Sequence, residues 1–190
     1  GGAFIGASAF ATGFSGARNL LETSDGRILL ADQGTHKVYD ISSGGDYSSD
    51  AGFAYIANSR FSDLVQDADG SIYAASYLLN AVYDITAGGD LSSAPAFATG
   101  RSFMALTING EGRLLAAPLG DPTIYDITDG GDFSSASAFA WNLPGTSDTA
   151  LDTVPMPVEQ PVPEPVSMIF FGTGLVGVAG FAVRRRRNRT

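Results

Sequence analysis

The sequence predicts an all-β fold: a partial β-propeller of four-stranded antiparallel blades, with one transmembrane helix after it. Three observations support this prediction. A unit of about 43 residues recurs along the chain, each unit contains short β-rich runs separated by Gly, Asp and Ser, and an uncharged run lies near the C-terminus. Repeats of about 20–50 residues are typical of solenoids, propellers and arrays.

The repeat is clearest in one twelve-residue segment. VYDISSGGDYSS at 38–49 recurs as VYDITAGGDLSS at 82–93 and as IYDITDGGDFSS at 124–135. A Phe follows each copy after a short interval, at Phe53, Phe97 and Phe139. We therefore expect one blade for each copy.

The first unit predicts four strands, at about 18–23, 27–33, 36–42 and 50–57. Asp25-Gly26 favours a tight turn between the first two strands, because both residues tolerate positive φ. Gly44-Gly45-Asp46 is expected to make the same kind of turn between the third and fourth strands. Four antiparallel strands at this period are typical of a propeller blade.

These units predict the organisation of the N-terminal part of the chain. Residues 1–13 align with 88–100 and are expected to end a truncated preceding blade. Propellers close with about four to eight blades, and the sequence starts without Met or an export signal. The complete protein is therefore expected to contain a signal peptide and further blades. The predicted blades span 14–57, 58–101 and 102–145.

The C-terminal part predicts a membrane anchor. Residues 146–165 form a Pro-rich linker, which we expect to be extended because proline fixes φ. Residues 166–183 carry no charge, and a helix of this length spans about 27 Å, enough for a thin bilayer. Residues 184–190 are rich in arginine, so the positive-inside rule places them in the cytoplasm and the body on the opposite side.

The three parts of this tail resemble the PEP-CTERM sorting signal of Gram-negative bacteria. The resemblance implies recognition by an exosortase-type membrane protease, with cleavage near the Pro-Glu-Pro. It also implies an inner-membrane precursor whose body lies in the periplasm and then moves to the cell surface or the extracellular matrix. The residues that carry the resemblance are Pro163, Glu164, Pro165, Arg184, Arg185, Arg186 and Arg187.

The repeats also resemble NHL-type propeller repeats. SDGRILLADQGTHKVYDI at 24–41 is similar to them in its order of turn, strand, His-basic pair and closing strand. The likeness is close in this first unit and looser in the other two, which lack a counterpart of His36-Lys37. The resemblance implies a propeller and no particular activity.

Composition excludes several classes of function. Residues 1–165 hold all 20 acidic residues and only six of the 11 basic ones, so nucleic-acid binding is not expected. The chain has no cysteine, which excludes a thiolate nucleophile or a zinc-thiolate site. The single histidine, His36, has no Ser–acid constellation beside it, so a hydrolase triad is not indicated. We expect no catalytic residue, cofactor or metal.

Candidate binding residues lie in the segments that vary between repeats. DQGTHK, SYLLNA and PLGDPT occupy the same place in the three units. Arg18, Arg60 and Arg101 precede or begin the first strands, and guanidinium groups there could bind an acidic polysaccharide. The alternative is that each arginine pairs with a nearby acid such as Asp63 or Asp32.

The repeated acids and tyrosines favour structural roles. Asp46, Asp90 and Asp132 recur at one place in the turns, where Asp commonly binds its own backbone rather than calcium. A Tyr-Asp pair also recurs once in each unit and is expected to join blades. We therefore interpret the chain as an exported, non-catalytic binding or structural module of the extracellular polysaccharide (biofilm) layer. The alternative is a metal-dependent propeller lactonase or lyase with ligands partly in missing N-terminal blades.

Overall fold

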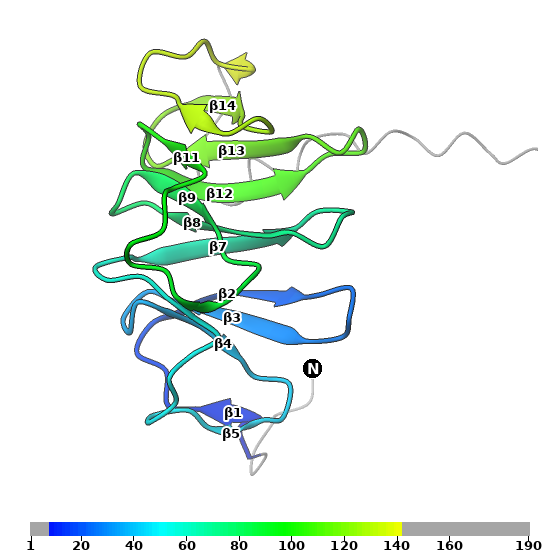
Figure 1. The fold of residues 1–190 in the computed structure, drawn as a ribbon, viewed down its shortest axis with the longest axis vertical. Helices are drawn as coiled ribbons and strands as arrows, with labels where there is room; N and C mark the ends of the chain where they lie inside the picture. Colours follow the sequence, from blue (N-terminus) through cyan, green and yellow to red (C-terminus); the bar gives the residue numbers. More distant parts are fainter. Residues whose placement is uncertain (1–7, 142–190) are drawn as a thin grey trace, which may run out of the picture. The chain divides into compact units, whose positions relative to one another are not determined.

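The computed structural model describes residues 8–141, which contain only strands, turns and irregular segments. Three antiparallel sheets, called blades 1, 2 and 3, follow one another in chain order (Figure 1). Blade 1 contains β2 (Ala17–Glu22), β3 (Ile28–Asp32), β4 (Lys37–Asp40) and β6 (Ala54–Tyr55). Blade 2 contains β7 (Phe61–Gln66), β8 (Ile72–Ser76), β9 (Ala81–Asp84) and β11 (Ala98–Thr99). Blade 3 contains β12 (Phe103–Ile108), β13 (Leu114–Pro118), β14 (Thr123–Asp126) and β16 (Ala140–Trp141).

The predicted all-β architecture of four-stranded antiparallel blades is confirmed for these residues. The turn predicted at Asp25-Gly26 joins β2 to β3, and the amide of Gly26 donates to the Thr23 carbonyl at 2.8 Å. Gly26 has φ +86°, a conformation that glycine adopts without steric cost. The fourth strand of each blade is shorter than expected, since only two residues pair with the third strand.

The Gly-Gly-Asp segments differ from the simple hairpin turns that the sequence predicted. They form short strands β5 (Gly45–Asp46), β10 (Gly89–Asp90) and β15 (Gly131–Asp132). Each pairs in parallel with the outer strand that precedes its own blade: β5 with β1 (Ala11–Thr12), β10 with β6 and β15 with β11. Positive φ at both glycines turns the chain outward, so that the second amide reaches a carbonyl of the neighbouring strand.

The hydrophobic core lies between successive blades. Leu29, Val38 and Ala54 of blade 1 pack with Phe61 and Ile72 of blade 2 in one buried cluster. A second cluster joins blades 2 and 3 in the same way. Because the central strands are covered on both faces, β3, β8 and β13 are nearly continuous apolar runs rather than alternating ones.

The prediction that the repeated Tyr-Asp pairs join blades is confirmed for the tyrosines. The aspartates instead accept from the amide two residues later in their own blade, at 2.9–3.1 Å. Tyr83 packs against the core between blades 1 and 2, and Tyr125 belongs to the core between blades 2 and 3. Tyr39 occupies the corresponding position in blade 1, where its ring lies 5.5 Å from that of Phe14, which precedes the blade. A residue that recurs once in each blade therefore serves packing.

Several predicted segments lie outside the described residues. These are the linker at 146–165, the transmembrane helix at 166–183 and the arginine-rich tail at 184–190. Within residues 8–141, no helix has the length and apolar character needed to cross a membrane.

Candidate binding face at the variable loops

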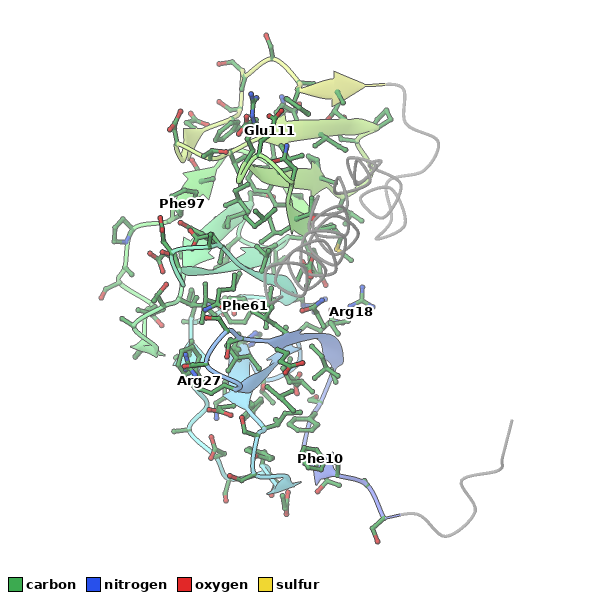
Figure 2. The ribbon with its side chains drawn as sticks, turned by 90° about the vertical axis from the view of Figure 1, so that its right-hand side faces the viewer. Phe10, Arg18, Arg27, Phe61, Phe97 and Glu111 are labelled. Carbon is green, nitrogen blue, oxygen red and sulfur yellow. The ribbon has the colours of Figure 1, made fainter. Side chains whose placement is uncertain are left out.

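The loops between the second and third strands of each blade lie at one end of the blades. They comprise residues 33–36, 77–80 and 119–122, and we call this end the variable-loop face. The first strands β2, β7 and β12 also begin here, because they run antiparallel to the second strands. The predicted arginines are therefore placed at this face. Figure 2 shows Arg18 on the opposite side of the molecule from Arg27, which lies in the turn at the other end of the β2–β3 hairpin.

Arg60 belongs to a hydrogen-bonded chain that joins blades 1 and 2. Its Nη1 donates to the Tyr77 hydroxyl at 3.3 Å, and that hydroxyl donates to Oε1 of Gln33 at 3.0 Å. The hydroxyl of Ser102 donates to the Tyr77 carbonyl at 2.6 Å and connects blade 3 to the same loop. Arg60 is exposed, so its remaining guanidinium donors face solvent. This chain presents a cation, a phenol and an amide on one surface.

The guanidinium group of Arg101 is bound by residues of its own blade. Its guanidinium donates to the carbonyls of Phe133 and Ser134 at 3.0 and 3.2 Å and lies 5.1 Å from the centroid of the Tyr125 ring. Nη1 is also 3.6 Å from a carboxylate oxygen of Asp121. Arg101 therefore forms an ion pair with a nearby acid, as the alternative to polysaccharide binding predicted, and the acid is Asp121.

The three predicted arginines occupy different register positions. Arg18 is the second residue of β2, within a β-bulge, whereas Arg60 directly precedes β7 and Arg101 stands two residues before β12. The structure brings Arg60 into contact with the variable loop of its own blade, and Arg101 into contact with the carbonyls that follow β15. A shared ligand site for all three stays a prediction.

Loop conformation explains the other residues that the sequence singled out at this face. Asp32 is fully buried, and its carboxylate accepts from the amides of Ser15 and Gly34 at 2.7 and 2.8 Å. His36 has φ +63°, and its Nδ1 contacts the Ser59 carbonyl. Asn80, at the same place in blade 2, has φ +52°. The histidine therefore occupies a left-handed turn position.

The sequence did not predict that Asp63 connects β7 of blade 2 to β12 of blade 3. Its Oδ1 accepts from the Leu64 amide at 2.9 Å, and its Oδ2 accepts from the Leu106 amide of β12 at 2.7 Å. A bulge lies at this register in every first strand, where Asn19 and Ala105 are the equivalents. The buried Oδ1 of Asn19 has no hydrogen-bond partner among the described residues. The bulge gave no signal in the sequence, because it depends on strand register.

The prediction that repeated acids stabilise turns is confirmed. Asp46, Asp90 and Asp132 each accept from the amide of the serine two residues later, at 2.9–3.0 Å. Hydrogen bonds from the Ser92 hydroxyl and amide lower the pKa of Asp90 below its ordinary value. Within residues 8–141, no three His, Asp or Glu side chains are grouped so that they could hold a metal ion. The metal-dependent lactonase or lyase stays a prediction.

The C-terminal sequence decides how the protein is sorted. Residues 161–187 match the model of the PEP-CTERM protein-sorting motif, which covers the Pro-Glu-Pro, the uncharged run and four of the five arginines. The chain carries a PEP-CTERM sorting motif. This motif marks it as an exported protein of a Gram-negative bacterium that is processed at the membrane, and it implies recognition by exosortase, a membrane protease.

Three solved structures resemble parts of the body. The match with virginiamycin B lyase from Staphylococcus aureus covers 60% of this chain and 38% of the lyase, with 17% identity and a TM-score of 0.45. The match with a streptogramin B lyase covers 64% of this chain and 55% of the lyase, with 13% identity and a TM-score of 0.39. The match with a Trichoderma reesei protein of Carbohydrate-Active Enzymes Family AA12 covers 71% of this chain and 42% of that protein, with 22% identity and a TM-score of 0.46.

The chain thus spans between 38% and 55% of the length of these structures. Likenesses at such TM-scores carry no argument about activity, and the assignment of blades rests on the strand pairing described above. No curated protein matches the chain.

Proposed function

We propose that this protein is a non-catalytic binding module of the extracellular polysaccharide layer. Its body is a partial β-propeller, and its PEP-CTERM motif sorts that exported body toward the cell surface or the extracellular matrix. In this proposal residues 166–183 hold the precursor in the membrane until cleavage near Pro163-Glu164-Pro165 releases the body toward the surface. The five arginines of residues 184–190 stop complete transfer until then.

The single observation that supports binding is the Arg60–Tyr77–Gln33 chain at the variable-loop face. A guanidinium group can bind a carboxylate or sulfate through two parallel hydrogen bonds. A phenol offers an apolar ring with a polar edge, and an amide both donates and accepts. Leu78, next to Tyr77, is 51% exposed and adds apolar surface. Together these groups suit a saccharide unit that carries an acidic substituent.

The choice of an acidic glycan follows from the local charge. The body as a whole is acidic and repels polyanions, so binding has to depend on the few cations at this face. Affinity should therefore fall as ionic strength rises, because solvent-exposed charges are screened over about 8–10 Å at ordinary salt concentrations.

Binding of the full chain in detergent to a soluble polyuronate tests the proposal. Isothermal titration calorimetry should show weak, salt-sensitive binding to the polyuronate and none to a neutral glucan of the same length. Arg60→Gln should weaken binding about tenfold or more, since a hydrogen bond to a charged group contributes about 1.5–3 kcal/mol. Tyr77→Phe removes only the hydroxyl that links Arg60 to Gln33 and should have a smaller effect.

Arg27→Gln is the matched control. Arg27 lies in the turn at the other end of blade 1, where it pairs with Asp25 at 2.9 Å. This variant should bind as well as the unmodified chain. Equal loss in the Arg27 and Arg60 variants would show that binding depends on net charge alone. No binding to any acidic glycan would leave a solvated structural protein as the function.

A further inference from the structure

The turn between β12 and β13 contains the only Asn-Gly pair of the sequence, at Asn109-Gly110. It lies at the end of the body opposite the variable-loop face, as do the matching turns of blades 1 and 2 (Figure 1). Asn109 is half-buried, whereas the next three residues are exposed. Asp25 and Asp69, at the tips of the matching turns, are exposed as well, although another blade packs beside each of their blades. Water therefore reaches this turn.

The side chain of Asn109 is held by the backbone of its own turn. Its Oδ1 accepts from the amides of Glu111 and Arg113 at 2.9 and 3.0 Å. Two amide donors at this distance stabilise an oxygen that becomes negatively charged when its carbon atom is attacked. The turn therefore activates Cγ of Asn109 toward a nucleophile.

The amide nitrogen of Gly110 is the nucleophile that follows in the chain. Among the described residues, no group accepts a hydrogen bond from this amide. The amide of Ala68, at the same place in blade 2, also has no acceptor within residues 8–141, even though blade 3 packs beside that blade. In blade 1 the corresponding Ser24 amide donates to Gln66 of blade 2 at 2.7 Å, but Ile108 stands in place of that glutamine in blade 3. The geometry of the turn thus leaves this nitrogen accessible.

We propose that Asn109 is a site of spontaneous deamidation in the folded, exported protein. The Gly110 nitrogen loses its proton to water and bonds to Cγ of Asn109, and the side-chain amide leaves as ammonia. Water then opens the five-membered imide, at Cγ to leave aspartate or at the backbone carbonyl to leave isoaspartate. Water is the only co-reactant, and nothing is oxidised or reduced. Glycine favours ring closure because it has no Cβ and its backbone is conformationally free.

Blade 2 indicates that the turn accepts the aspartate product. Asp67 stands at the place of Asn109, and its Oδ1 accepts from the amides of Asp69 and Ser71 at 3.0 and 2.8 Å. The backbone bonds match too, since the amides of Asn109 and Asp67 each donate to the carbonyl four residues later at 3.0 Å. Isoaspartate adds a methylene to the main chain and disturbs this pairing. Because ammonia is lost, the converted fraction records how long a chain has remained outside the cell.

Mass spectrometry of the full chain, incubated folded in detergent and neutral buffer, tests this proposal. Trypsin cleavage after Arg101 and Arg113 isolates residues 102–113, whose mass increases when the amide becomes an acid. The acid form should accumulate in the folded chain at a rate comparable with that of the chain unfolded in urea. Gly110→Ala should slow this conversion by about tenfold or more, because a Cβ restricts the backbone at the attacking residue. Asn58 and Asn80, which are exposed but not followed by glycine, should keep their amides.

Blade 2 provides the matched variant, because its turn has blades on both sides. Asp67→Asn combined with Ala68→Gly places the same pair there and should deamidate at a comparable rate. Asn109→Asp creates the product directly and should unfold at the same urea concentration as the unmodified chain. The proposal is overturned if Asn109 keeps its amide in the folded chain while it converts in urea. It is also overturned if the blade 2 variant keeps its new amide, or if Asn109→Asp destabilises the fold.

Discussion

Replacing Gly88 by alanine should separate two contributions to the joint between blades 1 and 2. Gly88 has φ +63°, and a Cβ atom there would lie 2.7 Å from the Phe53 carbonyl oxygen. That oxygen accepts from the Gly89 amide at 2.8 Å, and the Tyr55 carbonyl accepts from the Leu91 amide at the same distance. The added methyl group therefore meets backbone that cannot move without losing this pairing.

The expected cost follows from these contacts. A left-handed conformation costs a non-glycine residue about 1–2 kcal/mol. Two lost hydrogen bonds add about 0.5–1.5 kcal/mol each. Reduced freedom of the unfolded chain offsets about 0.4–1 kcal/mol of the total. Gly88→Ala should thus lower the free energy of unfolding by about 2–4 kcal/mol.

Gly89→Ala is the matched control. Gly89 has φ +80°, but a Cβ atom there would have nothing within 4 Å. This variant should carry the conformational cost without the clash, which leaves a loss of about 0.5–1.5 kcal/mol. Urea unfolding of both full-length variants, followed by far-ultraviolet circular dichroism, measures the difference. If Gly88→Ala is no more destabilising than Gly89→Ala, the parallel pairing of β10 with β6 does not hold the blades together.

Three further predictions concern charged groups and the tail. Arg101→Ala should lower the free energy of unfolding by about 1–3 kcal/mol, because two carbonyls lose a charged donor. Arg18 is exposed, so Arg18→Ala should change this free energy by less than about 0.5 kcal/mol in the same urea assay. Burial raises the pKa of Asp126, but the Thr128 hydroxyl and amide outweigh it and hold that pKa below the ordinary value. The ionised Asp126 carboxylate thus stabilises the fold fully at pH values above its unfolded pKa of about 3.9, and this stabilisation is lost as pH falls through its lower, folded pKa. Thr128→Val should raise the pKa of Asp126 measured by NMR titration. Deleting residues 163–190 should release a soluble periplasmic body, measured by cell fractionation, while persistence of the arginines on the mature protein in cells with the protease would contradict the sorting role.

The sequence alone determined the blade as the repeating unit and the PEP-CTERM motif as the sorting signal. Both depend on local features. A turn such as Asp25-Gly26 is defined by residues that tolerate positive φ, and the Tyr-Asp pairs recur at a constant interval whatever the tertiary arrangement. The sorting motif is recognised by composition and order along the chain. Such information is carried by a few neighbouring residues and does not need coordinates.

Only the tertiary structure decided what the repeated and variable residues contact. Gly44-Gly45-Asp46 looked like a hairpin turn, but its partner is a strand more than 30 residues earlier in the chain. Arg60 and Arg101 looked alike, yet one contacts Tyr77 at the surface and the other is tied to the Phe133 carbonyl. The reason is that these contacts join residues far apart in the sequence, and one residue of difference in position before β7 and β12 changes which neighbour an arginine reaches.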